Sequence, residues 1–189
     1  SSGGYKAYRS LGVETIEELA PKLRLIVLNG YTGAGKTLLL SRLEEVGAQV
    51  LDLEGMANHK GSVFGGDLEA PQPAQKNFES QIYEKLSQFD LNELVFIEAE
   101  SAKIGRLNLP NPLWQKLKSS PVIEIDSPVE ARAIYLAADY EEWVGNLERV
   151  HQTIDRLSGF HSSERLSNWK EMTVRGEWIP FVEDLLAER

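Results

Sequence analysis

The chain has 189 residues, of which 42% are hydrophobic and 26% are charged, so it can build the core of one domain, with or without a smaller appendage, and wholesale disorder is excluded. It contains no cysteine, which excludes disulfides, thiolate metal sites and a cysteine nucleophile in this segment. The formal net charge of −9 disfavours nonspecific adhesion to nucleic acid but leaves room for a local basic surface.

The first 22 residues are polar and contain no basic region followed by an apolar one, so we expect no signal peptide. No window of the chain approaches the roughly 18 apolar residues needed to cross a bilayer. Together with the absence of cysteine, this favours a cytoplasmic protein. The chain does not begin with Met, and we expect it to be part of a longer protein.

Residues 23–28 form a nearly continuous apolar run, which is typical of a strand buried on both faces. A glycine-rich turn follows, and apolar residues then recur at helical spacing until Gly47. Residues 50–53 indicate a second strand. The next twenty residues hold so many glycines and prolines that we expect a long loop without regular structure.

The alternation then continues with a helix predicted over 75–89, a third strand over 94–97 and a fourth strand over 122–125. Asn111-Pro112 is typical of a helix N-cap followed by proline at the first helical position. Residues 127–130 have the pattern of a capping box. From there to the end the chain is expected to be helical, with a stripe from Trp143 to Leu157, a C-cap at Gly159 and a last helix near the end.

Strands that alternate with helices predict an α/β fold. We expect a P-loop type, three-layer α/β/α domain with a parallel sheet over residues 23–140. A helical extension would follow over residues 141–189, and residues 1–22 would precede the domain.

Residues 30–37, GYTGAGKT, fit the pattern G-x-x-x-x-G-K-[ST] at every fixed position. In such loops the backbone curls so that several N–H groups point at an anion, and the helix that follows adds the positive end of its dipole. Lys36 is expected to reach the terminal phosphate, and the Thr37 hydroxyl is expected to hold Mg²⁺. The predicted phosphate-binding residues are Gly30, Thr32, Gly33, Ala34, Gly35, Lys36 and Thr37.

Carboxylates follow two of the predicted strands. Asp52 and Glu54 come after the second strand, and Glu98 and Glu100 come after the third. A Mg²⁺–phosphate site usually recruits a carboxylate from a neighbouring strand end, and the carboxyl ends of parallel strands share one edge. We therefore predict Thr37, Asp52 and Glu98 as metal ligands, while the division between metal ligand and general base among the acids stays open.

Several segments resemble one family, the bacterial tRNA 2-selenouridine synthases. Residues 52–65, DLEGMANHKGSVFG, are similar to that family's D-L-E-x-x-A-N-H-[RK]-G-S-x-F-G. Residues 71–79 resemble P-Q-P-[ST]-Q-x-x-F-E, and residues 98–106 resemble E-x-E-S-x-x-I-G-R. Residues 3–9 resemble the end of the rhodanese domain that precedes the P-loop domain in that family. The resemblance runs in order to about residue 140.

The resemblance implies a transferase that modifies the wobble uridine of tRNA. Such enzymes attach a geranyl group from geranyl diphosphate to 2-thiouridine and then replace the S-geranyl group with selenium from selenophosphate. The expected ligands are Mg²⁺ and these two co-substrates, with ATP or GTP as an alternative occupant of the loop. The expected partners are a tRNA anticodon stem-loop bearing 2-thiouridine and the rhodanese domain of the same protein, but no membrane and no DNA.

The family's rhodanese domain bears a catalytic cysteine that this chain lacks, so selenium transfer is not expected of this chain alone. The residues to which the loop, the strand ends and the resemblance together assign a catalytic role are Lys36, Asp52, Glu98, His59 and Arg106. Those assigned to substrate contact are Glu54, Asn58, Lys60, Gln72, Gln75, Glu100, Ser101 and Lys103.

Two other functions stay open at this stage. The fold alone would suffice for an ATP-dependent kinase of a small metabolite. Without catalysis, the chain would be a nucleotide-binding or RNA-binding module. The helical extension, which is dense in Arg and Trp, is expected to face RNA.

Overall fold

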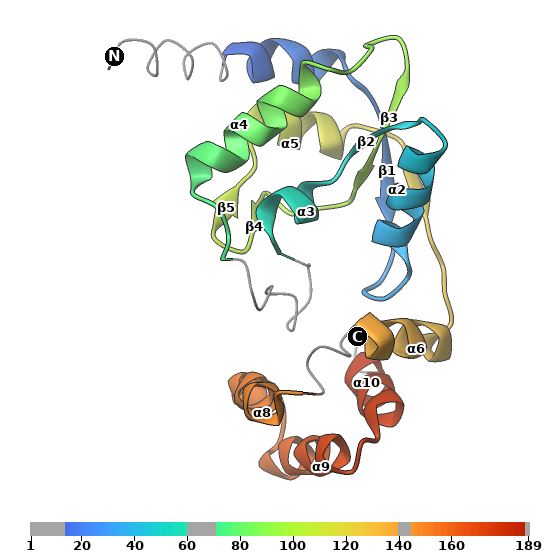
Figure 1. Ribbon diagram of the computed structural model, residues 1–189, viewed down its shortest axis with the longest axis vertical. Coiled ribbons are helices and arrows are strands. Elements are labelled where there is room, and N and C mark those ends of the chain that lie inside the picture. The colour runs from blue at the N-terminus through green and yellow to red at the C-terminus, as the bar shows by residue number, and fades with distance from the viewer. Residues whose placement is uncertain (1–13, 60–70, 140–144, 188–189) are drawn as a thin grey trace. The chain divides into compact units, whose positions relative to one another are not determined.

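The computed structural model describes residues 14–59, 71–139 and 145–187. Within these ranges the chain forms a parallel sheet flanked by helices, followed by a set of further helices (Figure 1). No helix in the described ranges combines the length and the apolar character that a membrane span requires.

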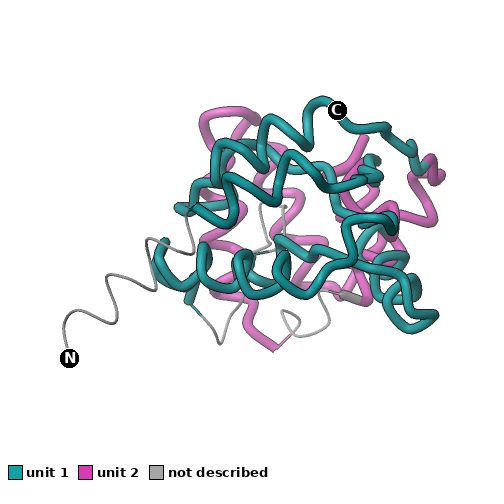
Figure 2. The backbone as a smooth tube through the Cα atoms, turned by 90° about the horizontal axis from the view of Figure 1, so that it is seen from above, with its two compact units in different colours: residues 1–30, 36–125 teal, residues 31–35, 126–189 magenta. Residues whose placement is uncertain are grey.

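The chain divides into two compact units, shown in two colours in Figure 2. Unit 1 comprises Ser1–Gly30 and Lys36–Ile125, and unit 2 comprises Tyr31–Gly35 and Asp126–Arg189. Five residues of the glycine-rich loop, Tyr31–Gly35, are thus grouped by their contacts with the C-terminal helices. The division into units falls at residue 125, whereas the sequence predicted a domain boundary at residue 140. The predicted domain boundary stays a prediction.

The sheet of unit 1 has the order β2-β3-β1-β6, and every pair in it is parallel. Its strands are β1 (Arg24–Asn29), β2 (Gln49–Leu51), β3 (Leu94–Glu98) and β6 (Val122–Glu124). In the register of β1 and β3, Leu28 lies opposite Glu98. The carboxyl ends of β1, β2 and β3 therefore meet at one edge, and the predicted α/β fold with a parallel sheet is confirmed.

Helices cover both faces of this sheet because successive strand residues point to opposite sides. On one face, strand residues such as Val27 and Ile97 pack with buried side chains of α4 (Gln75–Leu86) and α5 (Asn111–Lys118). On the other face, Leu28 and Val50 pack with Leu40 of α2 (Lys36–Glu45). The result is the expected layering of helix, sheet and helix (Figure 1).

The end of α2 is set by Gly47, as the sequence predicted. Gly47 has φ +88°, its N–H donates to Glu44 O at 2.9 Å, and Ala48 N–H donates to Leu43 O at 2.9 Å. This pair of bonds is a Schellman motif, which needs a residue in the left-handed region after the helix. Glycine meets that need without a steric penalty.

The expectation of irregular structure directly after residue 53 is wrong, because α3 (Leu53–Ala57) forms there. Asp52 caps this helix, with Oδ1 accepting the Gly55 N–H at 2.8 Å. The first and last residues of α3 are fully buried. The cap and this burial outweigh the unfavourable helix propensity of Gly55. As a consequence β2 ends at residue 51, two residues earlier than predicted.

Two predicted caps differ from the structure. α5 begins at Asn111 itself, and its N-cap position is Pro110, which offers no side-chain cap. Gly159 does not cap a helix but lies inside the 3₁₀ helix η2 (Arg156–Gly159), which Phe160 follows. The remaining elements of unit 1 are the helical residues 14–19, η1 (Ala20–Lys22) and the antiparallel hairpin of β4 (Lys103–Ile104) and β5 (Leu107–Asn108).

Unit 2 is helical, as expected for the C-terminal extension. Its helices are α6 (Val129–Asp139), α8 (Leu147–Asp155), α9 (Ser163–Val174) and α10 (Trp178–Leu186). Val150, Ile154 and Leu157 of the predicted apolar stripe are buried, while Trp143 lies outside the described residues. The core of this unit holds the fully buried Trp169, whose indole N–H donates to the Asp184 carboxylate at 2.6 Å.

Replacing Gly47 with Ala is expected to lower the free energy of unfolding by about 1 kcal/mol, because a Cβ is disfavoured at a positive φ. The added methyl would meet no neighbouring atom, so the cost comes from the backbone alone. Urea denaturation measures the change. The matched control is Val46→Ala at the adjacent, 80% exposed position, which should change stability by no more than about 0.5 kcal/mol. Equal effects of the two substitutions would contradict the assignment.

Candidate functional site

The glycine-rich loop joins β1 to α2, and its glycines adopt conformations that other residues avoid. Gly33 and Gly35 have φ values of +81° and +84°. At Gly33 an added Cβ would also lie 2.8 Å from the Leu136 side chain. Ala34 N–H donates to Tyr31 O at 3.0 Å inside the loop. Gly35, a fixed glycine of the pattern, and Gly33, at one of its variable positions, therefore both meet a conformational requirement.

Lys36 and Thr37 open α2, and both side chains turn toward the edge of the sheet. The Lys36 ammonium donates to Gly30 O at 2.9 Å, so its charge lies at the residue that follows β1. The Thr37 side chain hydrogen-bonds to Glu98, the last residue of β3. A cation and a hydroxyl are thus held beside the carboxyl end of the central strands.

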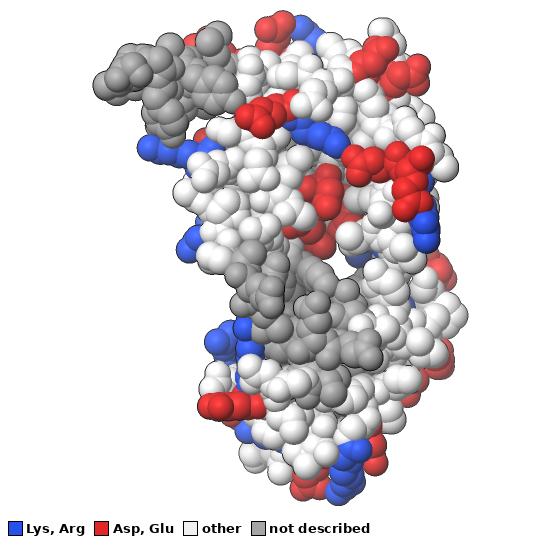
Figure 3. All heavy atoms as spheres, in the orientation of Figure 1, with Lys and Arg blue, Asp and Glu red and all other residues white. Residues whose placement is uncertain are grey.

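Three carboxylates gather at this edge. Glu54 comes from α3, Glu98 from the end of β3 and Glu100 from the segment that follows. One oxygen of each lies within 4.8 Å of an oxygen of the other two. Figure 3 shows a group of acidic side chains where Figure 1 places α3. The sequence predicted both pairs of acids at this edge, and the structure brings Glu54, Glu98 and Glu100 together.

Glu98 is only 1% exposed, and burial raises the pKa of its carboxyl group to about 7. The charge of Glu54 and, less strongly, that of Asp52 act in the same direction, while the Thr37 hydrogen bond and the Lys36 charge oppose them. Oε1 of Glu98 is buried and has no hydrogen-bond partner among the described residues. No donor or positive group of the described residues therefore satisfies that oxygen.

Glu100 behaves similarly. Burial is the largest cause that raises the pKa of its carboxyl group to about 8, followed by the charge of Glu54 and a hydrogen bond to Glu54. The charge of Glu98 adds to the effect, and the Lys36 ammonium opposes it. One ammonium does not balance three neighbouring carboxylates, so a proton or a further cation is favoured there.

The residues present fit a divalent cation of the magnesium type. Such ions prefer carboxylate and hydroxyl oxygens, and the cluster supplies three carboxylates with Thr37 adjacent. The buried Oε1 of Glu98 is the oxygen that a cation would satisfy. Asp52, which the sequence suggested as a ligand, instead uses Oδ1 to cap α3, although its charge still acts on Glu98. Its metal role stays a prediction.

Gln72 and Gln75, predicted to contact substrate, use their side-chain amides within the fold. Gln72 bonds to backbone groups of Ala57, Ile104 and Arg106. Gln75 donates to Asn108 O at 2.8 Å and accepts from Asn108 N–H at 2.9 Å. Both clamp the β4–β5 hairpin. A contact of either amide with substrate stays a prediction.

The β4–β5 hairpin and the residues just before it contain the other predicted residues of the 98–106 segment. The Ser101 hydroxyl donates to Lys103 O and accepts from Lys103 N–H at 3.2 Å, which closes a local turn. The Arg106 guanidinium donates to Gln72 O. The Lys103 and Arg106 residues are exposed. Their predicted role in binding phosphate or substrate is untested.

The residues after α3 are only partly described. Asn58 has φ +45° and ends the helix, and its side chain donates to Pro71 O at 3.4 Å. His59 is partly buried, and its Nδ1 has no hydrogen-bond partner among the described residues. Lys60 lies outside them. The roles predicted for these three residues stay predictions.

Sequence reasoning missed Arg132 of α6, a charged residue that is only 6% exposed. Its Nε–H donates to Thr32 O at 2.9 Å, and its guanidinium carbon lies 4.9 Å from the centre of the Tyr31 ring. Arg132 therefore holds the first part of the glycine-rich loop. The available signal was a single cation within an otherwise Ala-, Ile- and Leu-rich helix.

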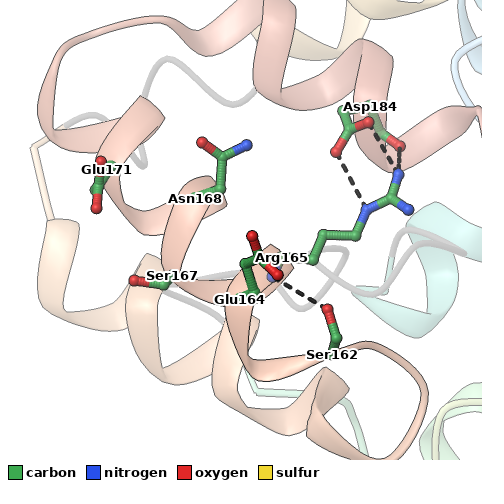
Figure 4. A pocket seen from close by; sticks show the side chains of 7 residues that line it. All are labelled: Ser162, Glu164, Arg165, Ser167, Asn168, Glu171 and Asp184. Carbon is green, nitrogen blue, oxygen red and sulfur yellow. Dashed lines mark hydrogen bonds and ion pairs between the residues drawn. The ribbon is translucent and has the colours of Figure 1, made fainter.

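The helical extension presents a pocket between α9 and α10 that is lined by three carboxylates and one cation (Figure 4). The cation, Arg165, forms a two-pronged ion pair with Asp184, at 3.2 Å from Nε and 2.9 Å from Nη2. Lys170 is likewise paired, at 2.6 Å from Asp155. This surface is thus not a cationic one, and the expectation that the extension faces RNA gains no support from it.

The raised pKa values of Glu98 and Glu100 predict that stability without divalent cations falls as the pH rises. Both groups bind protons more tightly in the folded chain, so their stabilisation is complete below about pH 4.5 and is lost as the pH passes 7 to 8. In buffer with EDTA, Glu98→Gln should gain stability relative to the wild type between pH 5 and pH 8, on the order of 1–2 kcal/mol after allowance for solvent screening.

Thermal and urea unfolding across this pH range measures the effect. Glu93→Gln, at an exposed position, is the matched control and should keep a constant difference from the wild type. A difference between Glu98→Gln and the wild type that does not change with pH would contradict the electrostatic account of the cluster.

Comparisons with known proteins agree with the motifs. The profile of the family described as "tRNA 2-selenouridine synthase AAA domain" matches residues 23–169. Three curated relatives, each named tRNA 2-selenouridine synthase, are similar to the chain. The relative from Nitrosomonas europaea is 36% identical over 83% of this chain and 42% of its own length. The relative from Shewanella frigidimarina is 39% identical over 74% of this chain and 37% of its own length. The relative from Marinobacter nauticus is 35% identical over 92% of this chain and 50% of its own length.

The chain spans about half the length of these relatives or less. The matched region contains the whole parallel sheet, the glycine-rich loop and all three carboxylates of the cluster. The resemblance predicted from the motifs is confirmed, and the chain belongs to the family of tRNA 2-selenouridine synthase AAA domains.

Proposed function

We propose that this chain is the diphosphate-binding catalytic domain of a transferase that modifies 2-thiouridine at the wobble position of tRNA. The observation that carries the proposal is the cluster of Glu54, Glu98 and Glu100 beside Lys36 and Thr37. It combines the parts that an enzyme needs to hold a metal-bound diphosphate. The names of the relatives, which are synthases acting on tRNA, support the substrate class.

The proposed reaction is the transfer of a geranyl group from geranyl diphosphate to the sulfur of 2-thiouridine. A sulfur–carbon bond forms at the first carbon of the geranyl group, and the bond from that carbon to the diphosphate oxygen breaks. Diphosphate leaves, and the N3 proton of the base is released. Most of the difficulty lies in the negative charge that develops on the leaving group, so its electrostatic stabilisation is the main task of the protein.

The side chains described above suit this task. Lys36 would pair with the departing diphosphate, and Thr37 would orient its counter-ion together with Glu54, Glu98 and Glu100. When bound, Mg²⁺ would supply the charge that neutralises the leaving group.

Selenium transfer is the second part of the proposal. In this part, selenophosphate occupies the same anion site, and a rhodanese domain outside these 189 residues supplies the cysteine that this chain lacks. Both co-substrates carry phosphate, which explains why one P-loop would serve both steps. Geranyl transfer requires no thiol, so the isolated chain is expected to carry out that step alone.

The test is to incubate the chain with Mg²⁺, geranyl diphosphate and an anticodon stem-loop that contains 2-thiouridine, and then to weigh the RNA. The expected product is heavier by one geranyl group. Lys36→Ala should reduce the initial rate by about a hundredfold, because it removes the cation that faces the leaving group. Lys22→Ala, which removes an exposed lysine paired with Glu18, is the matched control and should leave the rate unchanged.

The other outcomes are also informative. If ATP is consumed to phosphorylate a small metabolite and the RNA mass does not change, the chain is a kinase. Uptake of Mg²⁺ and diphosphate, measured by calorimetry, without a product would indicate a binding module. No uptake by well-folded protein would refute the proposal.

A further inference from the structure

The Gln72 side chain connects two segments that are far from it in the sequence. Its Nε2 donates to Ala57 O at 3.3 Å and to Ile104 O at 3.0 Å, and its Oε1 accepts the Arg106 N–H at 2.8 Å. Every bond goes to a backbone group, and together they use both ends of the amide. A single side chain therefore ties the end of α3 to the β4–β5 hairpin.

The hairpin is shaped to receive this amide. Gly105, at the turn, has φ +57°, and a Cβ added there would lie 2.3 Å from Gln72 Oε1. No side chain larger than hydrogen fits while the amide stays in place. The Arg106 guanidinium also donates to the Gln72 backbone carbonyl. Gln72 is thus fixed through its side chain and its main chain at once.

The two segments that Gln72 connects each carry one carboxylate of the cluster. Ala57 ends α3, which contains Glu54, and Ile104 lies four residues after Glu100. Glu54 and Glu100 repel one another when both are charged, because one oxygen of each lies within 4.8 Å of the other. Without this tie, only the apolar packing of residues such as Ala57 and Ile104 in the shared core would oppose a separation of α3 from the hairpin that relieves the repulsion.

We propose that Gln72 is a positioning residue that holds Glu54 and Glu100 at the spacing needed to bind one divalent cation. This inference rests on the proposed function, which puts such a cation at the cluster. The amide acts through backbone groups and not through contact with the cation. The expected consequence of its loss is a weaker cation site in a chain that still folds.

The Gln75 side chain serves as a comparison for Gln72, because its hydrogen bonds among the described residues reach the hairpin but not α3. It bonds to the same hairpin through Asn108, and its Nε2 also donates to Glu79 at 2.9 Å. Among the hydrogen bonds of the described residues, none joins Gln75 to α3. Removing the Gln75 amide should therefore loosen the hairpin without releasing Glu54 from Glu100.

The experiment compares Gln72→Met and Gln75→Met, which keep side-chain length but remove the amide. Calorimetry with Mg²⁺, and Mg²⁺ with diphosphate, measures affinity, and thermal unfolding in EDTA measures stability. Both variants should lower the melting temperature by comparable amounts. Gln72→Met should weaken Mg²⁺ binding by about tenfold or more, which is the usual effect of losing a residue that orients metal ligands. Gln75→Met should stay within about twofold of the wild type.

If Gln72→Met does not fold, Gly105→Ala provides a second route, because the added methyl displaces the same amide. It should give the same selective loss of Mg²⁺ affinity. Equal affinities for the wild type, Gln72→Met and Gly105→Ala would overturn the inference and leave the proposed function intact. Failure of the wild type itself to bind Mg²⁺ would refute the cation site and the inference with it.

Discussion

The main constraint on unit 1 is the repulsion among three carboxylates at one edge of its sheet. Glu54, Glu98 and Glu100 lie within 4.8 Å of one another, and Glu98 is almost fully buried. Like charges in a partly desolvated place raise the free energy of the folded chain, and the single ammonium of Lys36 compensates only part of it. A fold that keeps this arrangement does so at the expense of its own stability, which is typical of binding and catalytic sites.

The fold of unit 1 explains how the three carboxylates are held together despite their repulsion. Parallel pairing brings the ends of β2 and β3 to one edge, and the Asp52 cap starts α3 directly after β2, which places Glu54 there. The large apolar cluster beneath the sheet supplies the stability that the carboxylates remove. The polar tie at Gln72 adds hydrogen bonds between α3 and the hairpin to the apolar core that they share through residues such as Ala57 and Ile104.

The features that follow local rules could be predicted from the sequence. Four strands, the loop of residues 30–37 and the position of Glu98 at a strand end follow from apolar runs, a fixed motif and parallel topology. The start of α3 was missed because the Asp52 cap and the burial of Leu53 outweigh a glycine that suggests a loop. Gln72 was assigned to substrate because its partners lie 15 to 34 residues away, and no local pattern reports such contacts.

On the proposed function, the charge balance of the site constrains the order in which a cation and a diphosphate would bind. A diphosphate that approached the three carboxylates alone would meet repulsion, which the Lys36 ammonium beside Glu98 and Glu100 opposes. A divalent cation bound first, or carried in with the diphosphate, converts that repulsion into attraction for both ligands. Cation and diphosphate affinities are therefore expected to be positively linked, because each ligand removes a charge that opposes the other. On the proposed function, the three carboxylates would therefore favour a diphosphate that arrives with its metal over one that arrives without it.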